Sequence, residues 1–101
     1  MRKNKGVKYD AALIEHFTKH PDELKGYLEV ALEEYQEDGN EKAFLSALSL
    51  AAKVKGGFSK LSKSTGLNRE SLYKALSEHR DPRLSTIIQV VSSLGYSLKF
   101  A

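Results

Sequence analysis

The segment "GGFSKLSKSTGLNRESLYKALSEHRDP", residues 56–82, breaks a helical pattern of apolar residues after a short run and restarts it at once. Phe58, Leu61 and Thr65 lie along one side of a short predicted helix. Gly66 follows this helix, and because glycine adopts a positive φ at little cost, the chain can turn sharply there. The segment therefore predicts two short helices joined by a glycine turn.

The second short helix is expected to begin after Asn68, whose side-chain oxygen can accept hydrogen bonds from free backbone amides. Leu72, Ala75 and Leu76 mark its apolar side, so its polar side chains face outward. Two short helices set at an angle form a helix-turn-helix, in which the first crosses the DNA backbone and the second enters the major groove. A helical corner with a solvated polar face has the same pattern, but the surrounding basic residues favour DNA binding.

The outward side chains of this segment suit contacts with DNA. Arg69 and Lys74 can donate to guanine O6 and N7 or to phosphates, and Glu70 can accept from cytosine N4. Asn68 can bond to adenine, and Tyr73 can touch a thymine methyl group or a phosphate. Contacts to the DNA backbone are expected from the flanking basic residues Lys60, Lys63, Arg80 and Arg83.

Further helices are predicted on both sides of the segment. Upstream, apolar residues follow helical spacing over 13–17 and over 22–37. Gly39 and Asn40 then supply a left-handed exit and a cap for a third helix, which runs into the quoted segment. Downstream, the stretch 84–94 has the most apolar helical pattern in the chain, so we expect it at the centre of the core.

The last residues change from helical to alternating periodicity. Tyr96, Leu98 and Phe100 alternate with Ser97 and Lys99, which predicts a short strand. The predicted fold class is therefore all-α: a compact bundle of about five to six helices that contains the helix-turn-helix, plus one short C-terminal β-strand.

Length and composition exclude several classes of protein. The 101 residues suit one domain, no stretch is apolar enough to predict a membrane span, and the lack of cysteine fits the cytoplasm. His16 and His20 are spaced like metal ligands, but a third ligand is missing, so surface histidines are favoured and no metal is expected. No serine has an activating histidine–acid pattern, and Gly56-Gly57 lacks the lysine of a phosphate loop. We therefore expect neither an enzyme nor a cofactor.

Charge is distributed unevenly along the chain. Residues 1–9 are basic, residues 10–41 carry ten acidic residues against two lysines, and residues 53–83 carry eight basic residues against three acidic ones. This polarity indicates two partners, one of them polyanionic, although two solvated helical faces would give the same pattern. The acidic residues singled out are Glu29, Glu33, Glu34 and Glu37, as either a solvated helix face or a docking surface for a basic protein.

Residues 41–95 resemble a Cro/C1-type (Xre-like) helix-turn-helix domain. More narrowly, the chain resembles the probable addiction module antidote proteins, relatives of the HigA antitoxins. The segments that carry this resemblance are "YLEVALEE" (27–34), "AFLSALSLAAKVKGG" (43–57), "LSKSTGLNRESLYKALS" (61–77) and "DPRLSTIIQVVSSLGYSL" (81–98). There are two departures from the Xre-like pattern: Phe58 replaces a frequent phosphate-touching glutamine, which removes one backbone contact, and Ser62 replaces the usual alanine without steric harm.

The resemblance implies an antitoxin that neutralises a RelE-like toxin and represses its own operon as a homodimer on double-stranded operator DNA. It places the recognition helix at 69–78 and adds Ser77 to the residues that reach DNA. It implies that an RNA-cleaving, and therefore basic, toxin would bind the acidic glutamates. The expected organisation is a single domain with an N-terminal helical extension (1–40), an Xre-like core (41–95) and a C-terminal strand (96–101). A stand-alone, phage-like regulator without a toxin is the alternative.

The predicted C-terminal strand raises the question of its partner, because an isolated strand leaves its backbone amides and carbonyls unpaired. The Val7–Tyr9 segment, a strand of a toxin and the same strand of a second copy are all available. We favour the second copy, which would make Tyr96, Leu98 and Phe100 a dimer strand across a two-fold axis.

Overall fold

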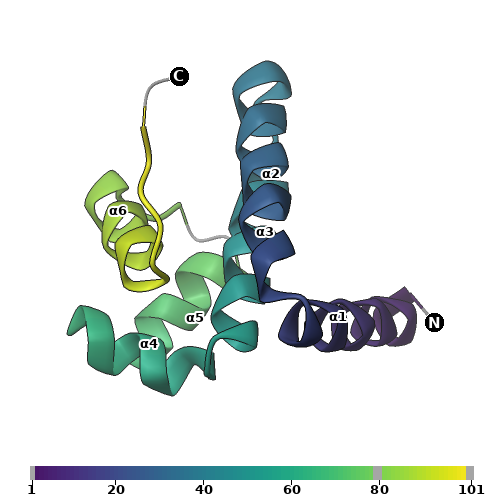
Figure 1. Cartoon of the computed structure of the whole chain (residues 1–101). Helices are drawn as coiled ribbons and strands as arrows, with labels where there is room; N and C mark the ends of the chain where they lie inside the picture. Colours follow the sequence, from purple (N-terminus) through teal and green to yellow (C-terminus); the bar gives the residue numbers. More distant parts are fainter. Residues whose placement is uncertain (1, 79–80, 100–101) are drawn as a thin grey trace.

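The chain forms helices where its apolar residues recur at helical spacing (Figure 1). The computed structural model describes residues 2–78 and 81–99, with side chains from residue 10 onward in those ranges. The described elements are α1 (Arg2–Lys19), the 3-10 turn η1 (Pro21–Glu23), α2 (Leu24–Asp38), α3 (Glu41–Val54), α4 (Gly57–Thr65), α5 (Arg69–Ser77) and α6 (Leu84–Ser93). Over these residues the predicted bundle of helices is confirmed.

The centre of the fold is α3, which packs against α1, α2, α4 and α5. Its buried residues are Phe44, Leu45, Ala47, Leu48, Ser49, Leu50, Ala51 and Ala52. The prediction that residues 84–94 are central was wrong, because α6 buries one side only and leaves Leu84 69% exposed. Total apolar content does not show how the apolar residues are divided between the faces of a helix, and small alanines let neighbouring helices approach α3 from several sides.

The helix ends upstream of α4 follow from local chemistry. Gly39 has a φ of 73° and its amide donates to the Tyr35 carbonyl, which closes α2. Asn40 then caps α3, its Oδ1 accepting from the Ala43 amide at 3.2 Å. Both predictions at this junction are confirmed. The first helix is longer than the 13–17 pattern indicated, since α1 begins at Arg2.

The predicted C-terminal strand is not found among the described residues. After Gly95, residues 96–99 are irregular, and the Tyr96 amide donates to the Val91 carbonyl at 3.0 Å. The Tyr96 ring packs on the core and lies under the Lys55 ammonium, 4.7 Å from its centroid. The alternating pattern gave the wrong result because a strand needs a neighbouring strand, and the described part of the chain contains none. Phe100 lies outside the described residues.

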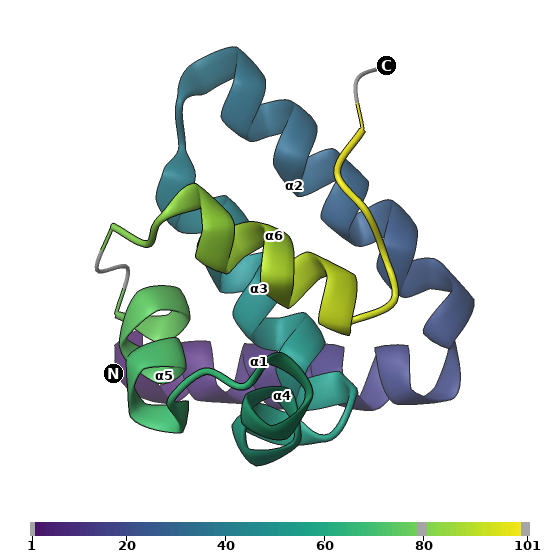
Figure 2. The same cartoon turned by 90° about the vertical axis from the view of Figure 1, so that its left-hand side faces the viewer.

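Different helices form the two ends of the molecule. Figure 1 places α4 and α5 at one end and α2 at the other, with α1 projecting to the side. Figure 2 shows α6 crossing in front of α3. The Cα radius of gyration is 13.0 Å, the value of about 13 Å expected for a compact domain of about 100 residues. No helix in the described ranges is long and apolar enough to cross a membrane.

Candidate functional site

The turn between α4 and α5 is held by two side chains of α4. Gly66 has a φ of 77° and its amide donates to the Ser62 carbonyl at 2.8 Å. Ser62 Oγ donates to the Leu67 carbonyl at 2.6 Å, and Thr65 Oγ1 accepts from the Leu67 amide at 3.1 Å. The role of Ser62 was missed from the sequence, where it was treated as a harmless replacement for alanine. Ser62 lies one turn before the glycine that ends α4, and backbone carbonyls at the end of a helix lack intrahelical partners. A hydroxyl group at this position could therefore have been recognised as a hydrogen-bond donor to the turn.

Asn68 caps α5, as predicted. Its Oδ1 accepts from the Ser71 amide at 3.1 Å. A bidentate contact with adenine needs both the oxygen and the NH₂ group of an asparagine, and here the oxygen is already engaged. Leu72 and Leu76 anchor the same helix from below, both fully buried. The position of α5 is therefore set at its start by the cap and along its length by the core.

The cap predicts a measurable loss of stability. Asn68→Ala should lower the free energy of unfolding by about 1 kcal/mol, because it leaves a backbone amide of α5 without its acceptor. Asn68→Ser is the matched control, since serine caps nearly as well. Urea unfolding followed by circular dichroism measures both variants. If alanine and serine unfold alike, the Asn68–Ser71 bond does not stabilise α5.

Four predicted contact residues of α5 are exposed together: Arg69, Glu70, Tyr73 and Lys74. Tyr73 is 47% exposed, and its ring meets that of Phe58 edge-on with centroids 5.7 Å apart. An open depression of about 700 Å³ lies beside this face. It is lined by Lys53, Phe58, Asn68, Arg69, Glu70 and Tyr73. Phe58, which stands where the Xre-like pattern frequently has a glutamine, therefore packs against the exposed ring of Tyr73.

Ser77 lies apart from this exposed row. It is half-buried, and its Oγ is 3.0 Å from Oγ of Ser49 on α3. Ser49 is a buried polar residue and needs a hydrogen-bond partner. The last turn of α5 thus faces α3, which spacing along the sequence did not reveal.

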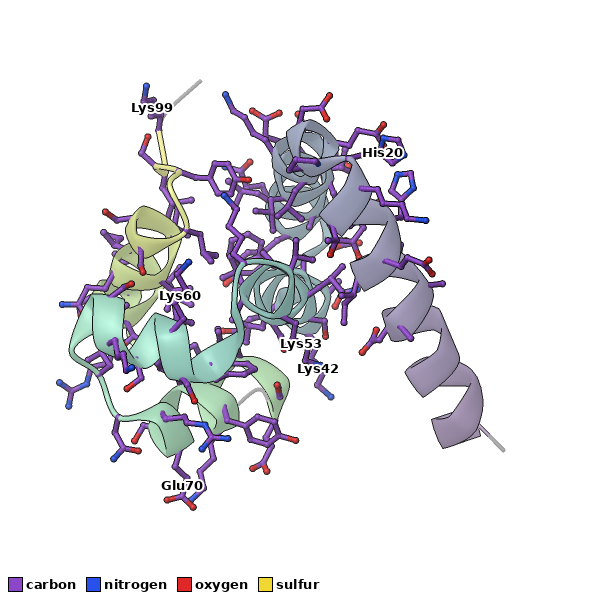
Figure 3. The ribbon with its side chains drawn as sticks, turned by 60° about the horizontal axis from the view of Figure 1, so that its bottom comes forward. His20, Lys42, Lys53, Lys60, Glu70 and Lys99 are labelled. Atoms are coloured by element: carbon purple, nitrogen blue, oxygen red, sulfur yellow. The ribbon has the colours of Figure 1, made fainter. Side chains whose placement is uncertain are left out.

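The flanking basic residues that the structure describes lie on different parts of the fold. Lys60 and Lys63 are exposed on α4, and Arg83 is exposed just before α6. Figure 3 labels Lys60 on α4 and Glu70 at the outer edge of α5. Arg80 lies outside the described residues.

The glutamates of α2 form an acidic surface away from α5. Glu29, Glu33, Glu34 and Glu37 are all exposed, and none has an ion pair with the side chains that the structure describes. Glu29, Glu33 and Glu37 follow one another at four-residue intervals, so they share a helix face. Like charges at this spacing destabilise a helix by a few tenths of a kcal/mol per pair, roughly 0.2–0.5 kcal/mol. A basic partner would relieve this repulsion.

The two histidines join α1 to the turn that follows it. His16 Nε2 lies 2.7 Å from Oε1 of Glu23, and the His16 and His20 rings are 4.7 Å apart. No group of three potential metal-binding side chains occurs in the described part of the molecule. The contacts of His16 therefore account for its position structurally.

Comparison with known proteins identifies the family. Residues 8–101 match the model of a family described as probable addiction module antidote protein. The chain belongs to this family. A relative from Haemophilus influenzae (strain ATCC 51907 / DSM 11121 / KW20 / Rd), described as an uncharacterized protein, is 36% identical over 86 residues, which cover 85% of this chain and 82% of the relative. No solved structure matches. The family description points to an addiction-module antitoxin, a protein that binds a partner toxin.

Proposed function

We propose that this protein is an antitoxin that neutralises a RelE-like toxin by direct binding and represses its own operon by binding operator DNA through α5. The observation that carries the DNA-binding part is the row of exposed polar residues on α5, Arg69, Glu70, Tyr73 and Lys74. The row sits on a capped helix behind a glycine turn, with its opposite side anchored in the core. Two short helices joined by a glycine turn are the elements of a helix-turn-helix, in which one of them enters the major groove, and this supports the proposal.

The distribution of charge supports the same proposal. Lys60 and Lys63 are exposed on α4, and Arg83 is exposed just before α6. Lys53 borders the depression beside α5 and has its Nζ 3.8 Å from Oδ2 of Asp10. We expect these basic residues to contact phosphates on either side of a recognition helix. Glu70 is the acidic exception in the exposed row, and a carboxylate there fits acceptance from cytosine N4 better than contact with a phosphate. Asn68 is left with its NH₂ group as a donor, because its oxygen caps α5.

A homodimer is part of the proposal, with α6 in place of the strand as its contact. Leu84 and Ile88 are exposed one turn apart on α6, and residues 84–98 contain no charged residue. A two-fold interface brings the same patch of both copies together, so a neutral apolar patch is suited to it. The two recognition helices would then read half-sites about 34 Å apart, or multiples of that distance.

The first test is a pair of substitutions on α5. Arg69→Ala and Lys74→Ala should each weaken operator binding by about 1–3 kcal/mol if the side chain contacts a base. Their effect on the free energy of unfolding should be small, because both side chains are exposed. Fluorescence anisotropy with labelled DNA from upstream of the protein's own gene measures the affinity.

Lys25→Ala on α2 is the matched control, because it removes an exposed lysine far from α5. Operator affinity that is unchanged in both α5 variants would contradict the assignment of α5 as the recognition helix. Co-purification with the product of the adjacent gene tests the toxin part separately. Operator binding without any such partner would favour a stand-alone regulator.

A further inference from the structure

A second concave surface lies on the far side of the molecule from the exposed row of α5. It is an open groove of about 700 Å³ between α2, α3, α6 and the C-terminal segment 95–99. Figure 1 shows this segment running alongside α2. The apolar residues that line the groove are Leu28, Leu32, Phe44, Leu48, Val91, Tyr96 and Leu98.

The C-terminal wall of the groove is fastened to the core at its base. Lys55 Nζ donates to the Leu94 carbonyl at 2.9 Å and lies 4.7 Å from the centroid of the Tyr96 ring. The ammonium thus binds the last turn of α6, where a cation is favoured by the helix dipole, and it holds the ring beside α3. Leu98 is farther along this wall and is 37% exposed, with no comparable contact.

The opposite wall, on α2, carries two carboxylates and one ammonium group. Glu29 and Glu33 line the groove together with Lys25, and neither glutamate has an ion pair among the described side chains. Lys99 lines the C-terminal wall. Glu34 and Glu37 are exposed on the same helix but do not line the groove. The groove therefore combines an apolar floor with a rim on α2 in which two glutamates outnumber one lysine.

We propose that this groove is where the toxin docks, through an amphipathic basic segment, which rests on the antitoxin function proposed above. Apolar side chains of that segment fill the space over Leu32, Phe44 and Leu98, and its lysines or arginines pair with Glu29 and Glu33. This is the mode in which an amphipathic segment lies in an apolar groove and flanking charges fix its direction.

Two other occupants fit the groove less well. DNA is disfavoured, because two carboxylates and two ammonium groups line the groove and leave no net positive charge to hold phosphates. A second copy of this chain is assigned to α6 instead, because the exposed apolar residues Leu84 and Ile88 lie outside the groove. Figure 3 places Lys99, at the end of the groove, and Glu70, on α5, at opposite ends of the molecule. The toxin can therefore occupy the groove while α5 is bound to DNA.

The test compares two double variants that change the same charge on the same helix. Glu29→Lys with Glu33→Lys reverses the rim of the groove, and Glu34→Lys with Glu37→Lys reverses the charge beside it. Binding of the purified product of the adjacent toxin gene is measured by calorimetry. We expect the first pair to weaken binding about 100-fold or more, because like charges then face each other, and the second pair to stay within about threefold, as screened surface charges do.

A third variant tests the apolar part of the groove. Leu98→Ser should weaken toxin binding about tenfold, since it removes buried apolar area at the contact while Leu98 contributes little to the free protein's core. All variants should bind operator DNA as the unmodified protein does, which shows that they are folded. Equal losses in both glutamate pairs, or no loss in either, would overturn the groove as the docking site. If the unmodified protein does not bind the toxin, the proposed function fails, and the groove proposal fails with it.

Discussion

Leu76→Ala is expected to lower the free energy of unfolding by about 2–5 kcal/mol, because it leaves a cavity where α5 meets the core. Leu76 is 0% exposed and belongs to the main apolar cluster with Leu45, Leu48 and Leu72. A domain of this size has a total stability of about 5–15 kcal/mol, so the variant should be visibly destabilised. Urea unfolding followed by circular dichroism measures the change.

The matched control is Leu84→Ala, which removes the same atoms from a side chain that is 69% exposed. In the monomer, this substitution should change the free energy of unfolding by no more than about 0.5 kcal/mol, as other surface substitutions do. Equal effects of the two substitutions would mean that α5 is not anchored through Leu76. If Leu84→Ala instead destabilises the protein only at high protein concentration, where dimers form, the α6 contact between copies gains support.

Features that depend on residues close together in the sequence were predicted correctly. The caps at Asn40 and Asn68 and the left-handed glycines at 39 and 66 each involve a hydrogen bond or dihedral angle within one helical turn. The division of α5 into a buried side and an exposed side also followed from spacing, except at Ser77, which faces α3. Local chemistry was sufficient in these places because the partner group lies only a few residues away.

Features that depend on distant partners were not predictable in this way. The Ser49–Ser77 contact joins residues that are 28 positions apart, and the bond from Lys55 to Leu94 spans 39. The C-terminal alternation indicated a strand, but tertiary packing of Tyr96 places that residue against the core instead. The groove is assembled from four separate segments, so its apolar floor formed no continuous pattern in the sequence, although Glu29 and Glu33 were singled out there as a possible docking surface.

Operator binding, if α5 reads DNA as proposed, is expected to fall by about 10⁴-fold between 50 and 200 mM salt, because each lysine or arginine that neutralises a phosphate releases a counterion. The candidate residues around α4 and α5 supply about four phosphate contacts per protomer and about eight per dimer, which corresponds to a log–log slope of roughly −7. A monomer on one half-site would give roughly −4. The slope therefore also reports whether one or two protomers bind.

Substitutions that remove single charges identify which residues contribute to the slope. Lys60→Gln and Lys63→Gln should each make it less steep by about 1 per protomer and weaken binding to all sequences alike, as loss of a phosphate contact does. Lys25→Gln, which removes an exposed lysine of α2, should leave the slope unchanged. Affinity titrations at four or more salt concentrations, on the operator and on unrelated DNA, separate these cases. A slope near zero in the unmodified protein would contradict a DNA contact through α4 and α5. The same reduction in all three variants would also contradict it, because the charge of the whole protein, rather than the lysines of this surface, would then determine the salt dependence.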